Sequence, residues 1–206
     1  MIIETIVTGP LEENCHLVQC PDSPAGALID PGDDADEILA AVSARGLHLT
    51  HILLTHAHFD HLGAVAALQR ASGAPVLLHE AERSSLGGVA LQSALFGLPA
   101  PELFQVNNWL KGGEKIAIGS LELQLLFTPG HSAGGVSFYG HGHLFPGDVL
   151  FRNSIGRSDL PGGDAGLLLH SIRTQLFTLP DDTIVHPGHG AATTIGHEKK
   201  YNPFLR

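Results

Sequence analysis

The sequence contains very little cysteine and no long apolar run. Its two cysteines, Cys15 and Cys20, cannot form the framework of a disulfide-rich secreted domain, so we expect two ordinary buried thiols in a reducing cytoplasm. No apolar segment approaches the roughly 20 residues that a membrane helix requires. The N-terminus has no basic region and no small-residue cleavage site, which argues against a secretory signal.

Positive charge is also scarce. The 206 residues include 11 Lys and Arg against 21 Asp and Glu, a net charge of −10, and a nucleic-acid partner would require more basic residues. The hydrophobic fraction of 43% is ample for a buried core, and the length predicts a single domain over residues 1–206. Histidine, by contrast, is abundant. Its 14 copies outnumber lysine and arginine together and indicate metal ligation or proton chemistry.

Short apolar runs bounded by glycine and proline predict strands. They cover residues 2–7, 15–18, 27–29, 51–55, 75–78, 115–118, 121–127, 136–139, 144–145 and 183–185. Amphipathic segments predict helices over residues 33–46, 62–71 and 165–179, with a further helical piece from about residue 80. Residues 87–101 are predicted as loop or short helix, and 151–163 as a long loop. This mixture of helices, strands and hairpins predicts sheets covered by helices.

Polar clusters follow directly on four of the predicted strands. The clusters are HAHFDH (56–61), TPGH (128–131), PGD (146–148) and PGH (187–189). Strand ends gather at one edge of a sheet, and glycine turns let the backbone bend so that each side chain faces inward. The set that these clusters assemble comprises His56, His58, Asp60, His61, His131, Asp148 and His189.

Five imidazoles and two carboxylates are the ligands expected for zinc, or for iron or manganese. Seven ligands are too many for one tetrahedral ion and suit two ions that share a bridging carboxylate. In an extended segment His56 and His58 point the same way, which leaves Asp60 and His61 for a second ion. A lone histidine at a strand end is more often structural, and Asp148 alone could cap a helix. Three histidines and an aspartate within six residues, however, have no packing rationale, so we predict a metal site.

These residues resemble the metallo-β-lactamase superfamily, and within it the short glyoxalase II-type hydrolases. The pieces that carry the resemblance are THAHFDH, TPGHSAGGVSFY, FPGDVLF, GRSDLPGGD and HPGHG. The resemblance implies an α/β fold, an αβ/βα sandwich of two mixed sheets flanked by helices, with a dinuclear metal centre at one edge. It assigns His56, His58 and His131 to one ion, Asp60, His61 and His189 to the other, and Asp148 to the bridge.

The resemblance also sets expectations outside the ligand set. The β-lactamases typically place a cysteine where Asp148 stands, so we do not expect antibiotic hydrolysis. Full-length glyoxalase II enzymes append a helical domain that holds glutathione, and only 17 residues (206 minus 189) follow His189, so no such domain is expected. Asp30 would either steady the ligand loop or cap its own turn. Arg157 would either bind a substrate carboxylate or brace its loop by pairing with Asp159.

The expected function is hydrolysis of a small thioester or ester by two divalent ions, with zinc favoured over iron or manganese. A metal-bridging hydroxide would attack the carbonyl carbon, and Asp60 would help to orient it. A persulfide dioxygenase of the same fold, with a single iron on His56, His131 and Asp148, is the principal alternative. A metal-storing or metal-sensing module is a weaker one, and the net charge of −10 weighs against a ribonuclease Z-type nuclease. No membrane partner is expected, and the sequence carries no signal of oligomeric state.

Overall fold

The computed structural model describes all 206 residues, and the first half of the chain forms one six-stranded sheet. Its strands lie side by side in sequence order: β1 (Ile2–Thr8), β2 (Glu13–Gln19), β3 (Ala25–Ile29), β4 (His48–Leu53), β5 (Val76–His79) and β6 (Val106–Leu110). The first three pair antiparallel, and β3 to β6 pair parallel. Parallel strands need crossover connections, which the helices α1 (Ala35–Ala44), α2 (Val65–Ser72) and α3 (Arg83–Leu95) supply.

The second half of the chain forms the other six-stranded sheet. Its spatial order is β14 (Thr193–Thr194), β13 (Ile184–Pro187), β10 (His143–Gly147), β9 (Val136–Gly140), β8 (Leu121–Phe127) and β7 (Lys115–Ile118). In β8 Leu121, Leu123 and Leu125 are buried and Glu122 and Gln124 are exposed, the alternation of a strand with one face on the core. Two short strands, β11 (Leu150–Phe151) and β12 (Ser154–Ile155), form a separate hairpin.

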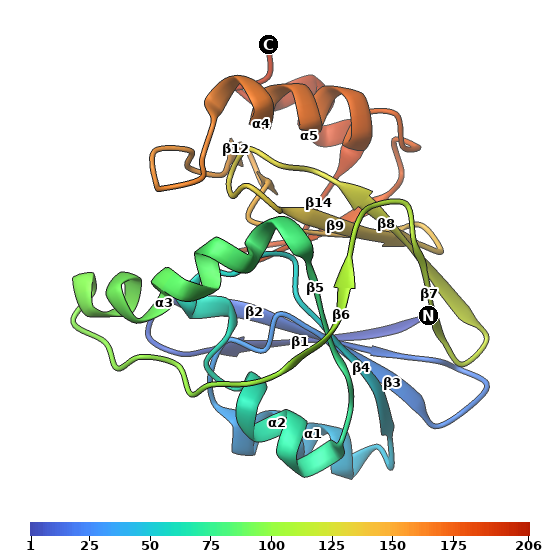
Figure 1. Ribbon diagram of the computed structural model, residues 1–206. Coiled ribbons are helices and arrows are strands. Elements are labelled where there is room, and N and C mark those ends of the chain that lie inside the picture. Colours follow the sequence, from blue (N-terminus) through green and yellow to red (C-terminus); the bar gives the residue numbers. More distant parts are fainter.

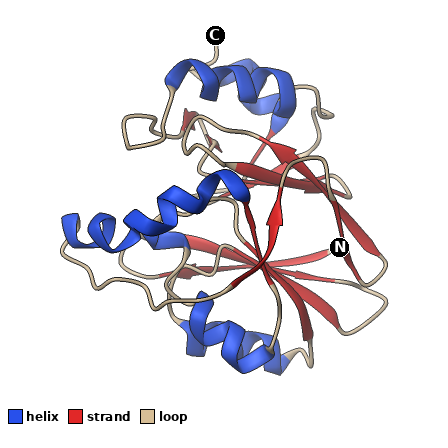
Figure 2. Cartoon of the chain, in the orientation of Figure 1, coloured by secondary structure: helices blue, strands red, loops and turns tan.

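Helices cover the outer face of each sheet, so the molecule has four layers (Figures 1 and 2). The helices α1 and α2 pack on the first sheet, while α4 (Ala165–Ser171), its continuation Ile172–Leu176, and α5 (Ile195–Tyr201) pack on the second. One apolar cluster fills each of the three spaces between layers, and the central one joins the two sheets through residues such as Ile29, Leu53 and Phe138. The predicted αβ/βα sandwich is confirmed.

The structure differs from the sequence-based expectation in several elements. Residues 87–95, predicted as loop or short helix, continue α3 as one helix in spite of Gly87 and Gly88, because its residues Val89 and Ser93 are buried against the rest of the protein. The strand β6 was not predicted, since its sequence VNNWL does not alternate. The hairpin β11–β12 begins at Leu150 and extends into the predicted loop 151–163, and the strand β14 and helix α5 were also missed.

Two remaining features agree with the composition. Cys15 and Cys20 are both buried and unpaired, as expected for ordinary thiols. None of the helices is long and apolar enough to cross a membrane.

Candidate metal centre

The seven predicted ligands all lie on loops that leave the ends of four strands. The loop after β4 carries HAHFDH, and the loops after β8, β10 and β13 carry the remaining three residues. Two glycines make this convergence possible. A Cβ on Gly147 would run into the side chain of Thr55, and one on Gly188 would run into Asp148 Oδ1. The Pro-Gly turns are therefore needed for close approach of the loops as well as for bending.

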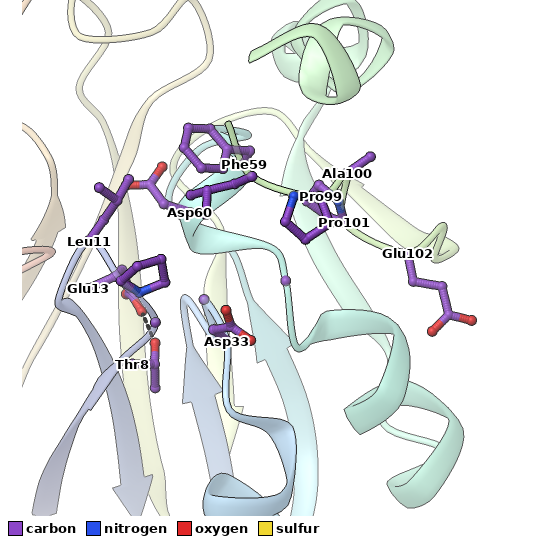
Figure 3. A pocket seen from close by; sticks show the side chains of 15 residues that line it. Thr8, Leu11, Glu13, Asp33, Phe59, Asp60, Pro99, Ala100, Pro101 and Glu102 are labelled. Carbon is purple, nitrogen blue, oxygen red and sulfur yellow. Dashed lines mark hydrogen bonds between the residues drawn. The ribbon is translucent and has the colours of Figure 1, made fainter. Parts of the chain in front are cut away.

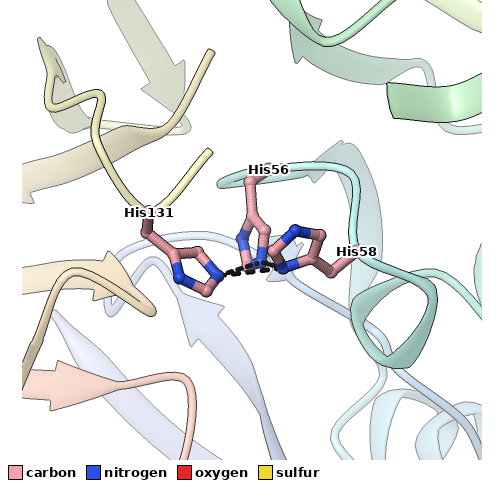
Figure 4. Close-up of side chains that lie close together, drawn as sticks. All are labelled: His56, His58 and His131. Carbon is pink, nitrogen blue, oxygen red and sulfur yellow. Dashed lines mark hydrogen bonds between the residues drawn. The ribbon is translucent and has the colours of Figure 1, made fainter. Parts of the chain in front are cut away.

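Three imidazoles of the first predicted group meet at one point (Figure 4). His58 Nδ1 lies 3.1 Å from His56 Nε2 and 2.9 Å from His131 Nε2, and the two Nε2 atoms are 3.3 Å apart. Three ligands about 2.0 Å from a tetrahedral ion would be about 3.3 Å from one another. These separations therefore have the dimensions of one face of a coordination tetrahedron.

The second predicted group converges in the same way. Asp60 Oδ2 lies 3.3 Å from His189 Nε2 and 3.9 Å from His61 Nε2. The carboxylate and both imidazoles thus present one ligand atom each to a common point. His61 Nε2 is buried and has no hydrogen-bond partner in the protein, which is costly for a polar atom unless a ligand satisfies it.

Asp148 lies between the two groups. Its Oδ1 is 3.5 Å from His61 Nε2, and its Oδ2 is 3.7 Å from both His131 Nε2 and His189 Nε2. One carboxylate therefore faces the nitrogen atoms of both groups, which is the placement that a bridging ligand requires. It does not cap a helix, because the residues that follow it form the hairpin β11–β12.

Hydrogen bonds on the far side of the rings fix which nitrogen faces the centre. The Nδ1 atom of His131 donates to Arg157 O at 2.8 Å, and that of His189 donates to Leu11 O at 3.1 Å. His56 Nδ1 donates to Thr55 Oγ1 at 2.9 Å, since that hydroxyl itself donates to Asp30. With Nδ1 protonated, each Nε2 keeps a free lone pair, as metal ligation requires.

The electrostatics of the centre favour the neutral forms of His56 and His58. Burial, reinforced by His131 and His61, lowers the pKa of His58 to about 3, and burial likewise holds the pKa of His56 well below its usual range. Burial opposes charge on His61 too, but the carboxylates of Asp148 and Asp60 outweigh it and raise that pKa. The chemistry of this donor set, five imidazoles beside two carboxylates, fits a pair of divalent cations.

Asp30 steadies the ligand loop. Its Oδ1 accepts the backbone N–H of Thr55 at 2.7 Å, and its Oδ2 accepts the Thr55 hydroxyl at 2.6 Å and His61 Nδ1 at 3.2 Å. Neither oxygen is used to cap the Asp-Pro-Gly turn, which was the other interpretation. Asp30 thereby holds His61 directly and His56 through Thr55.

The guanidinium of Arg157 is paired within its own loop. Its Nε and Nη2 donate to the two carboxylate oxygens of Asp159, each at 2.8 Å. The structure contains the bracing contact, and because Arg157 also lines the cavity, its contact with a substrate carboxylate stays a prediction. The loop brace also places the Arg157 carbonyl against His131.

Sequence reasoning missed Glu82, a fully buried carboxylate beside the centre. Its Oε1 accepts the backbone N–H of Gly134 at 2.6 Å, and its Oε2 accepts that of Ala57 at 3.2 Å. Ala57 stands between His56 and His58, so Glu82 ties the loop after β4 to the loop that carries His131. No sequence motif predicts this role of Glu82, because both of its hydrogen-bond partners are backbone groups.

A cavity of about 610 Å³ opens directly onto the predicted ligands. Its wall includes His58, Asp60, His131, Asp148 and His189. A smaller hollow of about 160 Å³ shares Leu11, Phe59 and Asp60 with it and is otherwise lined by residues such as Thr8, Glu13 and Pro99 (Figure 3). Only the larger cavity reaches both ligand groups and has the size usual for a small-molecule site.

Histidines outside the predicted set form ordinary contacts. His186, which adjoins the PGH cluster, stacks on Phe145 and bonds to His143 at 2.9 Å. His16 is buried and bonds to Pro187 O at 3.2 Å. Neither lines the large cavity, so both keep the structural interpretation.

With this fold and this ligand geometry, the class of protein is defined. Residues 8–189 match the family model of the metallo-β-lactamase superfamily, and the chain belongs to that superfamily.

Particular relatives are similar along nearly their whole length. The hydroxyacylglutathione hydrolase GloC of Haemophilus influenzae is 38% identical over 209 residues, covering 100% of this chain and 98% of the relative. Among solved structures, the BLEG-1 B3 metallo-β-lactamase has a TM-score of 0.92 at 41% identity, covering 99% of both chains. TTHA1623 in a di-iron-bound form has a TM-score of 0.90 at 44% identity, covering 98% of this chain and 100% of that one.

Proposed function

We propose that the protein is a dinuclear metal-dependent hydrolase of a small thioester or ester, of the hydroxyacylglutathione hydrolase type. The observation that carries this proposal is the convergence of two ligand groups on Asp148 at the floor of the 610 Å³ cavity. Similarity to GloC over the whole chain supports the thioester class. The cytoplasm remains the proposed compartment, on the argument from the two thiols.

The two ions would be held by the groups described above. His56, His58 and His131 would hold one, Asp60, His61 and His189 the other, and Asp148 would contact both. Bound divalent ions supply a water of lowered pKa and polarise a substrate carbonyl. Zinc is the proposed metal. Similarity to a di-iron-bound structure keeps iron as an alternative to be measured.

Asp60 would orient the attacking water. Its carboxylate lines the cavity and lies 3.3 Å from His189. Burial raises the pKa of Asp60, but His61 and His189 lower it by more, so the group stays ionised at neutral pH. An ionised carboxylate accepts a hydrogen bond from water and directs its lone pair towards a carbonyl carbon in the cavity.

A mononuclear iron persulfide dioxygenase is the second candidate. The observation that favours it is a set of two histidines and one carboxylate on one side of the centre. His131 Nε2 lies 3.3 Å from His56 Nε2 and 3.7 Å from Asp148 Oδ2. Two histidines and a carboxylate are the ligands of many non-haem iron oxygenases.

One set of measurements tests both candidates. Elemental analysis of the purified protein is combined with a panel of thioester, lactone, β-lactam and glutathione persulfide substrates. The hydrolase proposal predicts two metal ions per chain, release of thiol from thioesters, and no oxygen uptake. Rapid oxygen consumption with glutathione persulfide and one iron per chain would overturn it, and preferential β-lactam opening would overturn the thioester assignment.

A further inference from the structure

Helix α3 exposes large apolar side chains that the core does not use. Val89 and Ser93 face inward and are buried, whereas Leu91 and Leu95 are 69% and 77% exposed. The two leucines are four residues apart and so lie on the same side of the helix. Figure 1 shows α3 at the side of the molecule, extending away from the sheets rather than lying flat on either one.

These side chains line the same cavity as the predicted metal ligands. Leu91, Leu95 and Phe96, at the end of α3, form one wall. Leu11, Phe59 and Leu160 add further apolar surface. The Phe59 ring lies 5.1 Å from the Phe96 ring, centroid to centroid, which connects this wall to the loop that carries HAHFDH. The apolar wall, defined by these six residues, is therefore continuous with the metal centre.

The wall offers no free positive charge. Arg157 is the only lysine or arginine that lines the cavity, and its charge is paired with Asp159, to which its Nε and Nη2 donate. Arg83, at the start of α3, lies 3.7 Å over the ring of Trp109. Ser84, Ser85 and Gln92, polar residues of α3 that also line the cavity, are uncharged. A carboxylate or phosphate placed against this wall would lose hydration and gain no ion pair.

We infer that the cavity accepts an apolar, uncharged acyl group against the wall formed by α3, and that the preferred substrates are thioesters of medium-chain or aromatic acids. This inference rests on the proposed function. In the reaction, the carbon–sulfur bond breaks, and water supplies the oxygen of the released carboxylic acid and the proton of the released thiol. Burial of the acyl chain favours binding, since apolar surface leaves water.

The test is a series of thioesters with acyl chains of two to eight carbons, carried on neutral N-acetylcysteamine and in parallel on glutathione. We expect kcat/KM to rise up to about fourfold for each added methylene until the cavity is filled. The same rise should appear with both carriers, because the inference concerns the acyl group and not the thiol. Equal or falling kcat/KM with chain length on both carriers would overturn the inference.

Substitutions on α3 locate the effect. Leu91→Gln and Leu95→Gln keep helix propensity and alter exposed positions, and together they should reduce the octanoyl-to-acetyl ratio of kcat/KM about tenfold. Leu103→Gln is the matched control, because Leu103 is 94% exposed and does not line the cavity, and it should leave the ratio unchanged. An unchanged ratio in the double variant would overturn the inference. If the metal-loaded wild type cleaves no thioester at all, the proposed function itself fails.

Discussion

Replacement of Glu82 tests whether a buried carboxylate positions the first ligand group. In Glu82→Gln, one of the two oxygens becomes an amide nitrogen that faces a backbone N–H, either that of Gly134 or that of Ala57. Two donors then oppose each other in a site that excludes water. One of the two hydrogen bonds through which residue 82 connects the loop that carries His56 to the loop that carries His131 is therefore lost.

The magnitude follows from the geometry. A hydrogen bond to a charged group contributes about 1.5–3 kcal/mol and an unsatisfied buried donor costs about 1–3 kcal/mol, so we expect the unfolding free energy to fall by about 2–4 kcal/mol. A substitution behind a metal ligand typically lowers metal affinity about 10–100-fold. Because Glu82 bonds to Ala57, between His56 and His58, and to Gly134, near His131, the loss should fall mainly on the ion of the first group.

The assay is competitive metal titration with stability measured on the same samples. Glu198→Gln is the matched control. Glu198 is also fully buried and accepts bonds from Asn153 N, Thr193 Oγ1 and Asn202 Nδ2, but these partners belong to the C-terminal region. We expect both variants to lose stability and only Glu82→Gln to lose metal affinity. Equal metal affinity in the two variants would refute the positioning role.

Three further predictions follow from the same contacts. Asp148→Asn should lower the metal-to-protein ratio from two to about one and reduce hydrolysis at least about 100-fold; an unchanged ratio would contradict the bridging role. Gly188→Ala places a Cβ against Asp148 Oδ1 and 2.8 Å from His61 Cε1, so metal binding should weaken, whereas Gly87→Ala has open space and should stabilise α3 by up to about 1 kcal/mol in thermal unfolding. Weaker metal binding in both variants, or in neither, would argue against the close packing of Gly188 on Asp148. Burial lowers the pKa of His16 to about 4. The unfolded chain therefore binds more protons between pH 6.5 and 4, and His16 should cost up to about 3 kcal/mol of stability as pH falls through that window. The measurement is the pH dependence of urea unfolding against His16→Gln, and parallel curves for the two proteins would refute it.

The ligand set was predictable because each cluster follows an apolar strand. The prediction needed only that strand ends share an edge, and the structure brings His56, His131 and Asp148 together across up to 92 residues (148 minus 56). The strands 115–118 and 121–127 were predicted with the bounds that the structure has, because their apolar pattern is bounded by glycines and a Pro-Gly turn.

The remainder depends on contacts that leave no sequence pattern. Glu82 acts through the backbone N–H groups of Gly134 and Ala57, and any residue type except proline could supply those donors. The strand β6 pairs with β5 although its sequence does not alternate, and Asn107 within it accepts the N–H of Val76. Helix α3 contains Gly87 and Gly88, whose low helix propensity is overridden by burial of Val89.

The division of the chain into two sheets has a consequence for assembly. Residues 111–114 join the end of β6 to the start of β7, so a cut there separates the two half-sandwiches. Each predicted ion takes ligands from both: His56 and His58 with His131, and Asp60 and His61 with His189. Metal binding would thus connect the two halves, which also meet through the central apolar layer and through hydrogen bonds such as that from Gly134 N to Glu82. If the chain is cut between Gly112 and Gly113, metal binding would indicate that the two fragments have associated, because neither fragment contains all the ligands of either ion.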